Sequence, residues 1–295
     1  MIGPVVRRSF IQAMIFASRP AAQRCALGLL AIAALLATGP APGRTMPPWP
    51  GTLLLVGGGD LPASIAARFV RLAGGRDRRF VYIPTAAPDK EIDPAALEHA
   101  FRTTFGVDRV TILHTRDRRI ADSADFARTI DQADAVWFGG GRQWRIADAY
   151  LGTRTEAALR GLLERGGVVG GTSAGASILA SFLVRGAPEG NWIIDAPGHE
   201  QGFALLPKAA VDQHVDRYHR ENDIAPIIRA HPGILGIGLD EATGLFVAHG
   251  VASVVGAGRV ILHDGTMTCG TPYVVLRAGA RFRIGAPLTA PCSAD

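Results

Sequence analysis

The sequence is poor in several features that mark common classes of protein. Aromatic residues make up only 7% of the 295 residues, whereas glycine is frequent at 36, which favours an α/β fold with tight turns. We find no internal repeat, and no low-complexity stretch beyond one proline-rich linker. No cluster has metal-ligand spacing, because His214 and His219 are five residues apart and do not form H-E-x-x-H.

Excess charge is also missing once the N-terminal segment is set aside. The formal net charge is +5, but residues 1–44 contain five arginines and no lysine or acidic residue. Of the 31 basic residues, 26 therefore remain, against 26 acidic ones. A neutral balance offers no basic surface for nucleic acid, so we expect no nucleic-acid partner.

The N-terminal segment has the pattern of an export signal. Arginines precede the apolar run Ala26–Ala37, which is about as long as a signal-peptide core and short for a membrane span. We expect residues 1–38 to be a signal peptide and residues 39–50 a proline-rich linker. Arg7-Arg8 also resembles a twin-arginine motif, so Sec export, Tat export and an uncleaved anchor all stay open.

The three cysteines agree with export to the periplasm or the cell exterior. Cys25 would leave with the signal peptide, and Cys269 and Cys292 would remain. In an oxidising compartment these two can form a disulfide. Spacing alone does not bring them together, so two free thiols are an equal alternative.

Short apolar runs alternate with helical patterns from Thr52 to about residue 183, which predicts a doubly wound, mostly parallel sheet with helices on both faces. After residue 234, short strands follow one another with glycine turns and no helix between them. This texture predicts an antiparallel extension on the same core. We expect one domain over residues 51–265, with residues 266–295 as its C-terminal strand extension.

Gly171-Thr172-Ser173-Ala174-Gly175 lies between a buried strand and a helix. This is the setting of a nucleophile elbow, a sharp turn that presents a serine hydroxyl at the edge of a sheet. The N–H of Ala174 would point to the position where an oxyanion develops. A glycine-rich turn with a capping serine is the alternative.

A nucleophilic serine needs a base and an acid. His214, in Asp212-Gln213-His214, follows a short extended stretch and is the strongest of several candidate bases. Asp240 and Glu241 end an apolar strand, and alternation turns them to opposite sides, so at most one faces the histidine.

Two glycine runs also end predicted strands. Gly139-Gly140-Gly141 could supply the second oxyanion donor through a bare N–H, from Gly140 or Gly141, and Gln143 could orient substrate. Gly57-Gly58-Gly59 lacks the spacing of a nucleotide-binding loop, so we reject a nucleotide site there.

Together these residues resemble the cyanophycinase and dipeptidase E family of serine peptidases. Four blocks carry the resemblance in order over about residues 50–265, namely Trp-Phe-Gly-Gly-Gly-Arg-Gln, Gly-Thr-Ser-Ala-Gly-Ala, Asp-Gln-His and Gly-Ile-Gly-Leu-Asp-Glu. The resemblance implies a flavodoxin-like fold related to class I glutamine amidotransferases, and a homodimer. It also implies Ser173 as nucleophile, His214 as base and Glu241 as orienting acid, with Asp240 and Asp212 as rivals for the acid.

The resemblance also implies a substrate-binding set of residues. They are Gln143, Asp212, Gln213, Arg217 and Arg220, and Arg142 is a further candidate for gripping a substrate carboxylate. The family carries several arginines after Asp-Gln-His. Here Tyr218 and Asp223 stand where two of them are expected, so a substrate other than cyanophycin stays open.

The expected chemistry is hydrolysis of a peptide or β-aspartyl isopeptide bond through an acyl-enzyme, with no cofactor or metal. One alternative is an esterase of the α/β-hydrolase type, in which Asp195 or Glu200 would be the acid for His214. Another is a non-catalytic binding module on the amidotransferase scaffold.

Overall fold

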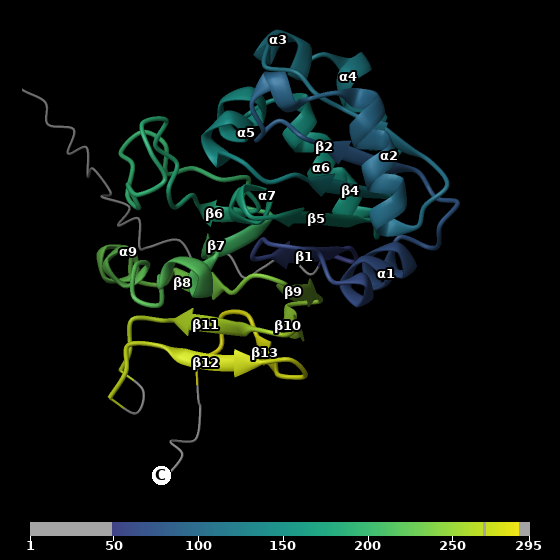
Figure 1. The fold of residues 1–295 in the computed structure, drawn as a ribbon. Coiled ribbons are helices and arrows are strands. Elements are labelled where there is room, and N and C mark those ends of the chain that lie inside the picture. Colours follow the sequence, from purple (N-terminus) through teal and green to yellow (C-terminus); the bar gives the residue numbers. More distant parts are fainter. Residues whose placement is uncertain (1–48, 268–269, 289–295) are drawn as a thin grey trace, which may run out of the picture. The chain divides into compact units, whose positions relative to one another are not determined.

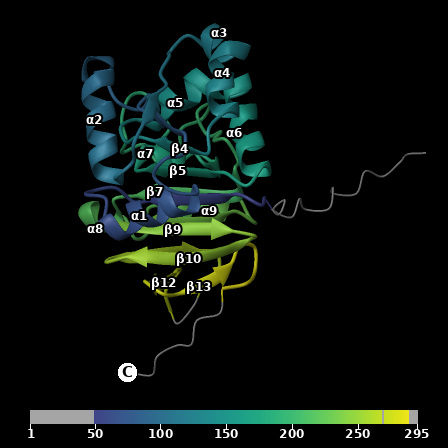
Figure 2. The same ribbon diagram turned by 90° about the vertical axis from the view of Figure 1, so that its right-hand side faces the viewer.

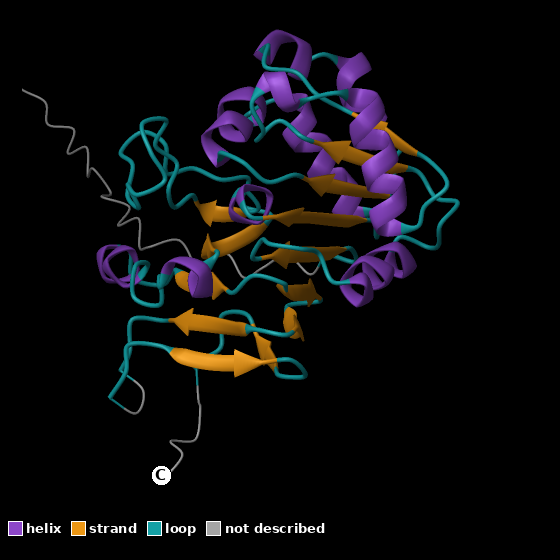
Figure 3. Ribbon diagram, in the orientation of Figure 1, coloured by secondary structure: helices purple, strands orange, loops and turns teal. Residues whose placement is uncertain are grey.

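A computed structural model of the chain describes residues 49–267 and 270–288. The predicted signal peptide, the linker up to residue 48, and the two cysteines of the possible disulfide lie outside the described residues. Helices and strands alternate along most of the described chain, and strands alone fill its C-terminal part (Figure 3).

The central sheet is parallel from β1 to one edge and antiparallel from β1 to the other (Figure 1). Its strands are β1 (Thr52–Val56), β2 (Phe80–Ile83), β3 (Val110–Ile112), β4 (Ala135–Phe138), β5 (Val168–Thr172), β9 (Thr243–Ala248), β10 (Val251–Gly256) and β13 (Arg281–Arg283). Their order is β13-β10-β9-β1-β5-β4-β2-β3, and β1 to β5 are mutually parallel. Because both faces of this sheet are covered, every residue of β1 is buried. Burial on both faces explains the continuous apolar run Leu53–Val56 in this strand. The predicted fold class is confirmed.

A second sheet adjoins the first and contains the rest of the strands. They are β6 (Ala180–Phe182), β7 (Leu206–Gln213), β8 (Leu235–Leu239), β11 (Arg259–His263) and β12 (Val274–Arg277), in the order β12-β11-β8-β7-β6. The strands after residue 234 are therefore divided between two sheets, a detail that the sequence analysis did not anticipate. The chain crosses between the sheets at Asp240–Ala242 and again after Gly256, where Ala242 and Gly256 have positive φ.

Helices cover both faces of the central sheet (Figure 2). One layer is α1 (Ala63–Leu72) and α2 (Pro94–Phe105), and the other is α3 (Arg118–Ala121), α4 (Ala124–Asp131), α5 (Gln143–Tyr150) and α6 (Arg154–Glu164). Three short helices, α7 (Ala174–Ser177), α8 (Val215–Tyr218) and α9 (Ala225–Ala230), follow β5, β7 and α8. In the part of the chain with described structure, no helix is both long and apolar enough to cross a membrane.

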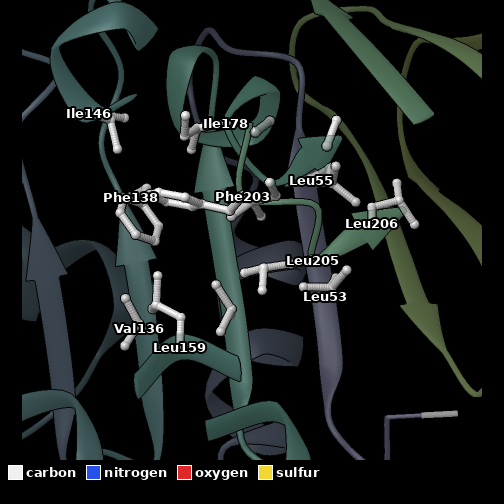
Figure 4. Packing of buried hydrophobic residues seen from close by; sticks show 14 of the residues in the cluster. Leu53, Leu55, Val136, Phe138, Ile146, Leu159, Ile178, Phe203, Leu205 and Leu206 are labelled. Carbon is white, nitrogen blue, oxygen red and sulfur yellow. The ribbon is translucent and has the colours of Figure 1, made fainter. Parts of the chain in front are cut away.

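Strand alternation divides the core between these layers. Leu53 and Leu55 of β1 belong to the cluster with α4, α5 and α6, whereas Leu54 belongs to the cluster with α1 and α2. Figure 4 shows the first cluster, in which the rings of Phe138 and Phe203 lie 5.7 Å apart. The sheet is thus fixed from both sides, and its strand ends are held at a common edge.

Leu159 of α6 is fully buried in this core. We expect Leu159→Ala to lower the free energy of unfolding by about 2–5 kcal/mol, because it removes buried apolar atoms and leaves a cavity. Urea denaturation would measure the loss. Leu72→Ala, at a leucine with 40% exposure, is the matched control and should cost less than about 1 kcal/mol. Equal losses at both positions would contradict the described packing.

His263 at the end of β11 is 1% exposed and donates from Nε2 to the carbonyl of Glu221 at 2.8 Å. Burial lowers the pKa of His263 below its ordinary value of 6.5. The unfolded chain then binds the proton more readily, so protonation favours unfolding and stability is lost as the pH falls. We expect the free energy of unfolding to decrease below about pH 6.5.

The decrease should be smaller in His263→Gln, which keeps a hydrogen-bond donor but cannot be protonated. Urea denaturation from pH 8 to pH 5 would compare the two proteins. A residual decrease is expected from His114, whose pKa is also lowered, first by burial and then by Arg116. The same pH dependence in both proteins would contradict the role of His263.

Candidate active site

Ser173 occupies a strained turn between β5 and α7. Its backbone has φ 54° and ψ −117°, a region that non-glycine residues rarely adopt. The turn is held by the Ser173 N–H, which donates to the carbonyl of Val56 at 2.9 Å. A methyl group on Gly171 would lie 2.2 Å from the Gly175 carbonyl oxygen, so the small flanking residues are a steric requirement. The elbow predicted from the sequence therefore forms.

Ser173, His214 and Glu241 are connected by hydrogen bonds. The Oγ of Ser173 lies 2.8 Å from Nε2 of His214, and Nδ1 of the same ring lies 2.6 Å from Oε1 of Glu241. A carboxylate only accepts, so Nδ1 carries the hydrogen and Nε2 is left to accept from the serine hydroxyl. The histidine follows β7 and the glutamate follows β8, which is parallel to β7, so both side chains emerge at the same sheet edge.

The rival acids point elsewhere. Asp240 is 2% exposed and its Oδ2 accepts from Nε of Arg259 at 2.8 Å. Asp212 is 1% exposed and accepts two hydrogen bonds from Arg185, both at 2.8 Å. Since Glu241 occupies Nδ1 of His214, the geometry disfavours the esterase alternative, which required Asp195 or Glu200 at that nitrogen.

The loop after β4 lies directly against the serine. A methyl group on Gly140 would be 3.5 Å from Cβ and 4.0 Å from Oγ of Ser173. Two backbone hydrogen bonds fix the loop on either side. The N–H of Gly139 donates to the carbonyl of Ile83, and the N–H of Arg142 donates to the carbonyl of Ala86. Across residues 49–267 and 270–288, the N–H groups of Gly140, Gly141 and Ala174 donate to no backbone carbonyl, so they are free to bind a developing oxyanion.

The glycine run after β1 is a part of the site that the sequence analysis missed. A methyl group on Gly58 would lie 2.1 Å from Cε1 of His214, and one on Gly59 would lie 2.9 Å from Oε2 of Glu241. The Gly57 carbonyl also accepts from the N–H of His214 at 2.9 Å. Only the run itself, at the end of a strand, was a sequence signal. Its role depends on β1 lying beside β5, which the sequence does not show.

Comparisons with known proteins show which family the chain belongs to. Residues 53–255 match the model of peptidase family S51. The chain belongs to peptidase family S51. It is 29% identical over 227 residues to a cyanophycinase from Geminocystis herdmanii, covering 72% of this chain and 80% of the relative. It is 30% identical over 224 residues to a cyanophycinase from Synechococcus elongatus, covering 72% and 68%.

A solved structure also resembles the chain. It is a peptidase from an acI-B1 actinobacterium, with a TM-score of 0.65 and 25% identity, covering 79% of this chain and 97% of that protein. This S51 member is therefore an enzyme of the serine peptidase type. Among the described residues, no group of three or more His, Cys, Asp or Glu side chains is arranged to hold a metal ion.

The predicted substrate-binding residues of this S51 peptidase are three buried residues, Gln143, Asp212 and Gln213, and a set of arginines. Two are used within the protein, because Asp212 binds Arg185 and Gln143, 1% exposed, donates from Nε2 to the carbonyl of Val184 at 2.8 Å. Gln213 is different, since its Oε1 is buried without a hydrogen-bond partner among the described atoms.

The predicted substrate-binding arginines are Arg142, Arg217 and Arg220. Arg220 donates to the Gln213 carbonyl at 3.3 Å and lies 4.4 Å above the ring of Tyr218. Burial, and then the neighbouring Arg185, lower the pKa of Arg220. Arg142 donates to the carbonyl of Ala187, whereas Arg217 is exposed. Arg220 is therefore the predicted arginine that the structure brings beside Asp212-Gln213-His214.

Arg185 is a second residue that the sequence analysis missed. Its side chain is 3% exposed, and besides Asp212 it binds Oδ2 of Asp223 at 2.6 Å. Burial lowers the pKa of Arg185, but the hydrogen bonds that it donates to the two aspartates, together with their negative charges, outweigh this effect and raise the pKa overall. Asp223, which stands where the family pattern has an arginine, thus adds a half-exposed carboxylate to the buried ion pair of Arg185 and Asp212. No sequence signal marked Arg185, because a single arginine after a β-strand is ordinary.

Gly58→Ala tests the role of the glycine run. The added methyl group would displace the His214 imidazole, so we expect hydrolytic activity to fall by about 100-fold or more. Gly75→Ala is the matched control, because Gly75 has φ 120°, close to the 117° of Gly58, and its methyl group would meet only Oδ1 of Asp77 at 3.3 Å. Thermal denaturation would show similar strain in both proteins. Equal activity of the two variants would refute the contact.

Proposed function

We propose that this S51 peptidase hydrolyses a peptide or β-aspartyl isopeptide bond through an acyl-enzyme on Ser173. The observation that carries the proposal is the unbroken chain of hydrogen bonds from the serine Oγ through His214 to Glu241. This arrangement activates a hydroxyl and stabilises the imidazolium that forms when the hydroxyl proton moves.

In the first half of the reaction, Oγ of Ser173 attacks the carbonyl carbon while Nε2 of His214 takes the hydroxyl proton. The carbonyl oxygen becomes an oxyanion, which the N–H groups of Ala174 and Gly140 or Gly141 stabilise. His214 then protonates the leaving nitrogen, the C–N bond breaks, and an ester on Ser173 remains. Throughout, Glu241 keeps the imidazole oriented.

In the second half, a water molecule attacks the ester carbonyl and His214 takes its proton. The C–Oγ bond breaks, the proton returns to Ser173, and the carboxylic acid leaves. The Oε1–Nδ1 distance of 2.6 Å is that of a charge-assisted hydrogen bond, which strengthens as positive charge develops on the ring.

The similarity to cyanophycinases supports an aspartyl peptide or isopeptide as substrate. Cyanophycin itself is one candidate, and Gln213 and Arg220 are the side chains that would position it, since Gln143 is buried and hydrogen-bonded to a backbone carbonyl. The exchange of two family arginines for Tyr218 and Asp223 favours a smaller or different aspartyl peptide. The first experiment is therefore to measure which of these substrates the enzyme hydrolyses.

Export and a homodimer complete the proposal. The Arg-rich start and apolar run within residues 1–38 support export through the Sec or Tat pathway. Cell fractionation with N-terminal sequencing would locate the protein and its cleavage site. Sedimentation of the mature protein would establish its oligomeric state. Mature protein found only in the cytoplasm would refute export.

Product analysis against cyanophycin and a panel of aspartyl and β-aspartyl dipeptides tests the mechanism. We expect Ser173→Ala to lower kcat/KM by about 10⁵-fold and Glu241→Gln by about 10³–10⁴-fold, because the nucleophile and the orienting acid are lost. The exposed Ser64→Ala and Glu164→Gln are matched controls and should keep full activity.

Each other outcome identifies a different function. Activity that survives Glu241→Gln but not Ser173→Ala would favour the esterase alternative. A wild-type protein that no serine-directed fluorophosphonate labels, and that cleaves no member of the panel, would favour the binding module.

A further inference from the structure

A small apolar pocket opens between α2 and the carboxyl ends of β1, β2, β4 and β5. It measures about 170 Å³. Leu61, Leu97, Ala100 and Phe101 form much of its wall. This is room for about five or six water molecules, which suits the side chain of one medium or large amino acid.

The pocket adjoins the proposed catalytic groups on several sides. Thr172, which lines it, directly precedes Ser173. Gly59, which also lines it, contacts Glu241 closely enough that a methyl group there would lie 2.9 Å from Oε2. The Tyr82 hydroxyl reaches Gly139 at the start of the oxyanion loop, where a methyl group would lie 2.5 Å from Oη. A substrate bound at Ser173 therefore has this pocket beside it.

No charged side chain lines the pocket among the described residues. Its polar groups are hydroxyls, those of Tyr82, Thr104 and Thr172. Burial raises the pKa of Tyr82, which keeps its hydroxyl neutral at physiological pH. A guanidinium or carboxylate placed here would lose its hydration against a mostly apolar wall, and no described residue that lines the pocket carries a charge to pair with it.

We propose that this pocket is a subsite for an uncharged aliphatic or aromatic side chain of the substrate, on the residue that leaves with the new amine. The inference rests on the proposed function, because it takes an aspartyl residue as the acyl part. A leucine or phenylalanine side chain would contact Leu97 and Phe101, whereas glycine would leave the pocket unfilled and arginine would be rejected. The enzyme would then select its substrate by apolar burial beside the scissile bond.

Binding to the full chain carrying Ser173→Ala separates recognition from catalysis. Isothermal titration calorimetry would compare β-aspartyl-leucine, β-aspartyl-phenylalanine, β-aspartyl-glycine and β-aspartyl-arginine. We expect the leucine and phenylalanine dipeptides to bind about 10- to 100-fold more tightly than the other two, because they bury a side chain.

Ala100→Asp, added to Ser173→Ala, places a carboxylate at the pocket wall. We expect it to weaken binding of the leucine dipeptide about 10-fold or more and to strengthen binding of the arginine dipeptide. Ala96→Asp is the matched control, because Ala96 is an exposed alanine of the same helix that does not line the pocket. It should leave the order of affinities unchanged. Tighter binding of β-aspartyl-arginine by the Ala100→Asp variant could not result from misfolding, because a misfolded protein would lose affinity for every dipeptide.

Two further measurements distinguish the possible failures. Fluorophosphonate labelling of the wild-type chain tests whether Ser173 is a reactive nucleophile, independently of what binds in the pocket. Labelling together with equal affinity for all four dipeptides, or with no binding at all, would overturn the subsite and leave the proposed chemistry standing. The expected order of affinities without labelling or hydrolysis would support the subsite and overturn the acyl-enzyme. An order of affinities that Ala100→Asp does not change would also overturn the subsite.

Discussion

The close contact between the β1 glycine run and the His214 imidazole is the constraint on which the site depends. Ser173 comes from the central sheet, whereas His214 and Glu241 come from the ends of strands in the second sheet. The carbonyl of Gly57 holds the backbone of His214, and Gly58 leaves just enough room for the ring. A methyl group on Gly58 would lie 2.1 Å from Cε1 of His214 and would displace the ring from its position beside Ser173.

Local patterns carried the most reliable part of the sequence analysis. The alternation of strands and helices predicted the parallel sheet, and the small residues around Ser173 predicted the elbow, because both depend on neighbouring residues. His214 and Glu241 were harder, since their assignment needed four motif blocks in a fixed order. The division of the C-terminal strands between two sheets was not predictable, because glycine turns look alike whether or not the chain changes sheets.

Residues that act through distant contacts were the ones that sequence reasoning missed. Gly58 matters through its position against a ring 156 positions later, and Arg185 matters through two aspartates on other segments. Asp212 is a residue for which sequence reasoning predicted a role in substrate binding that the structure does not support. It belongs to a motif block, but its carboxylate is buried and accepts two hydrogen bonds from Arg185. This ion pair holds the Asp212 carboxylate inside the protein, two residues before His214.

The three-residue crossing Asp240–Ala242 connects the two sheets and also carries the Glu241 carboxylate. The acid is therefore attached to the hinge between two packed layers, while its partner histidine belongs to one of them. A small sliding of one sheet against the other would lengthen the Oε1–Nδ1 contact long before any strand or helix is lost. The hydrogen bond between Glu241 and His214 therefore depends on how closely the two sheets are packed.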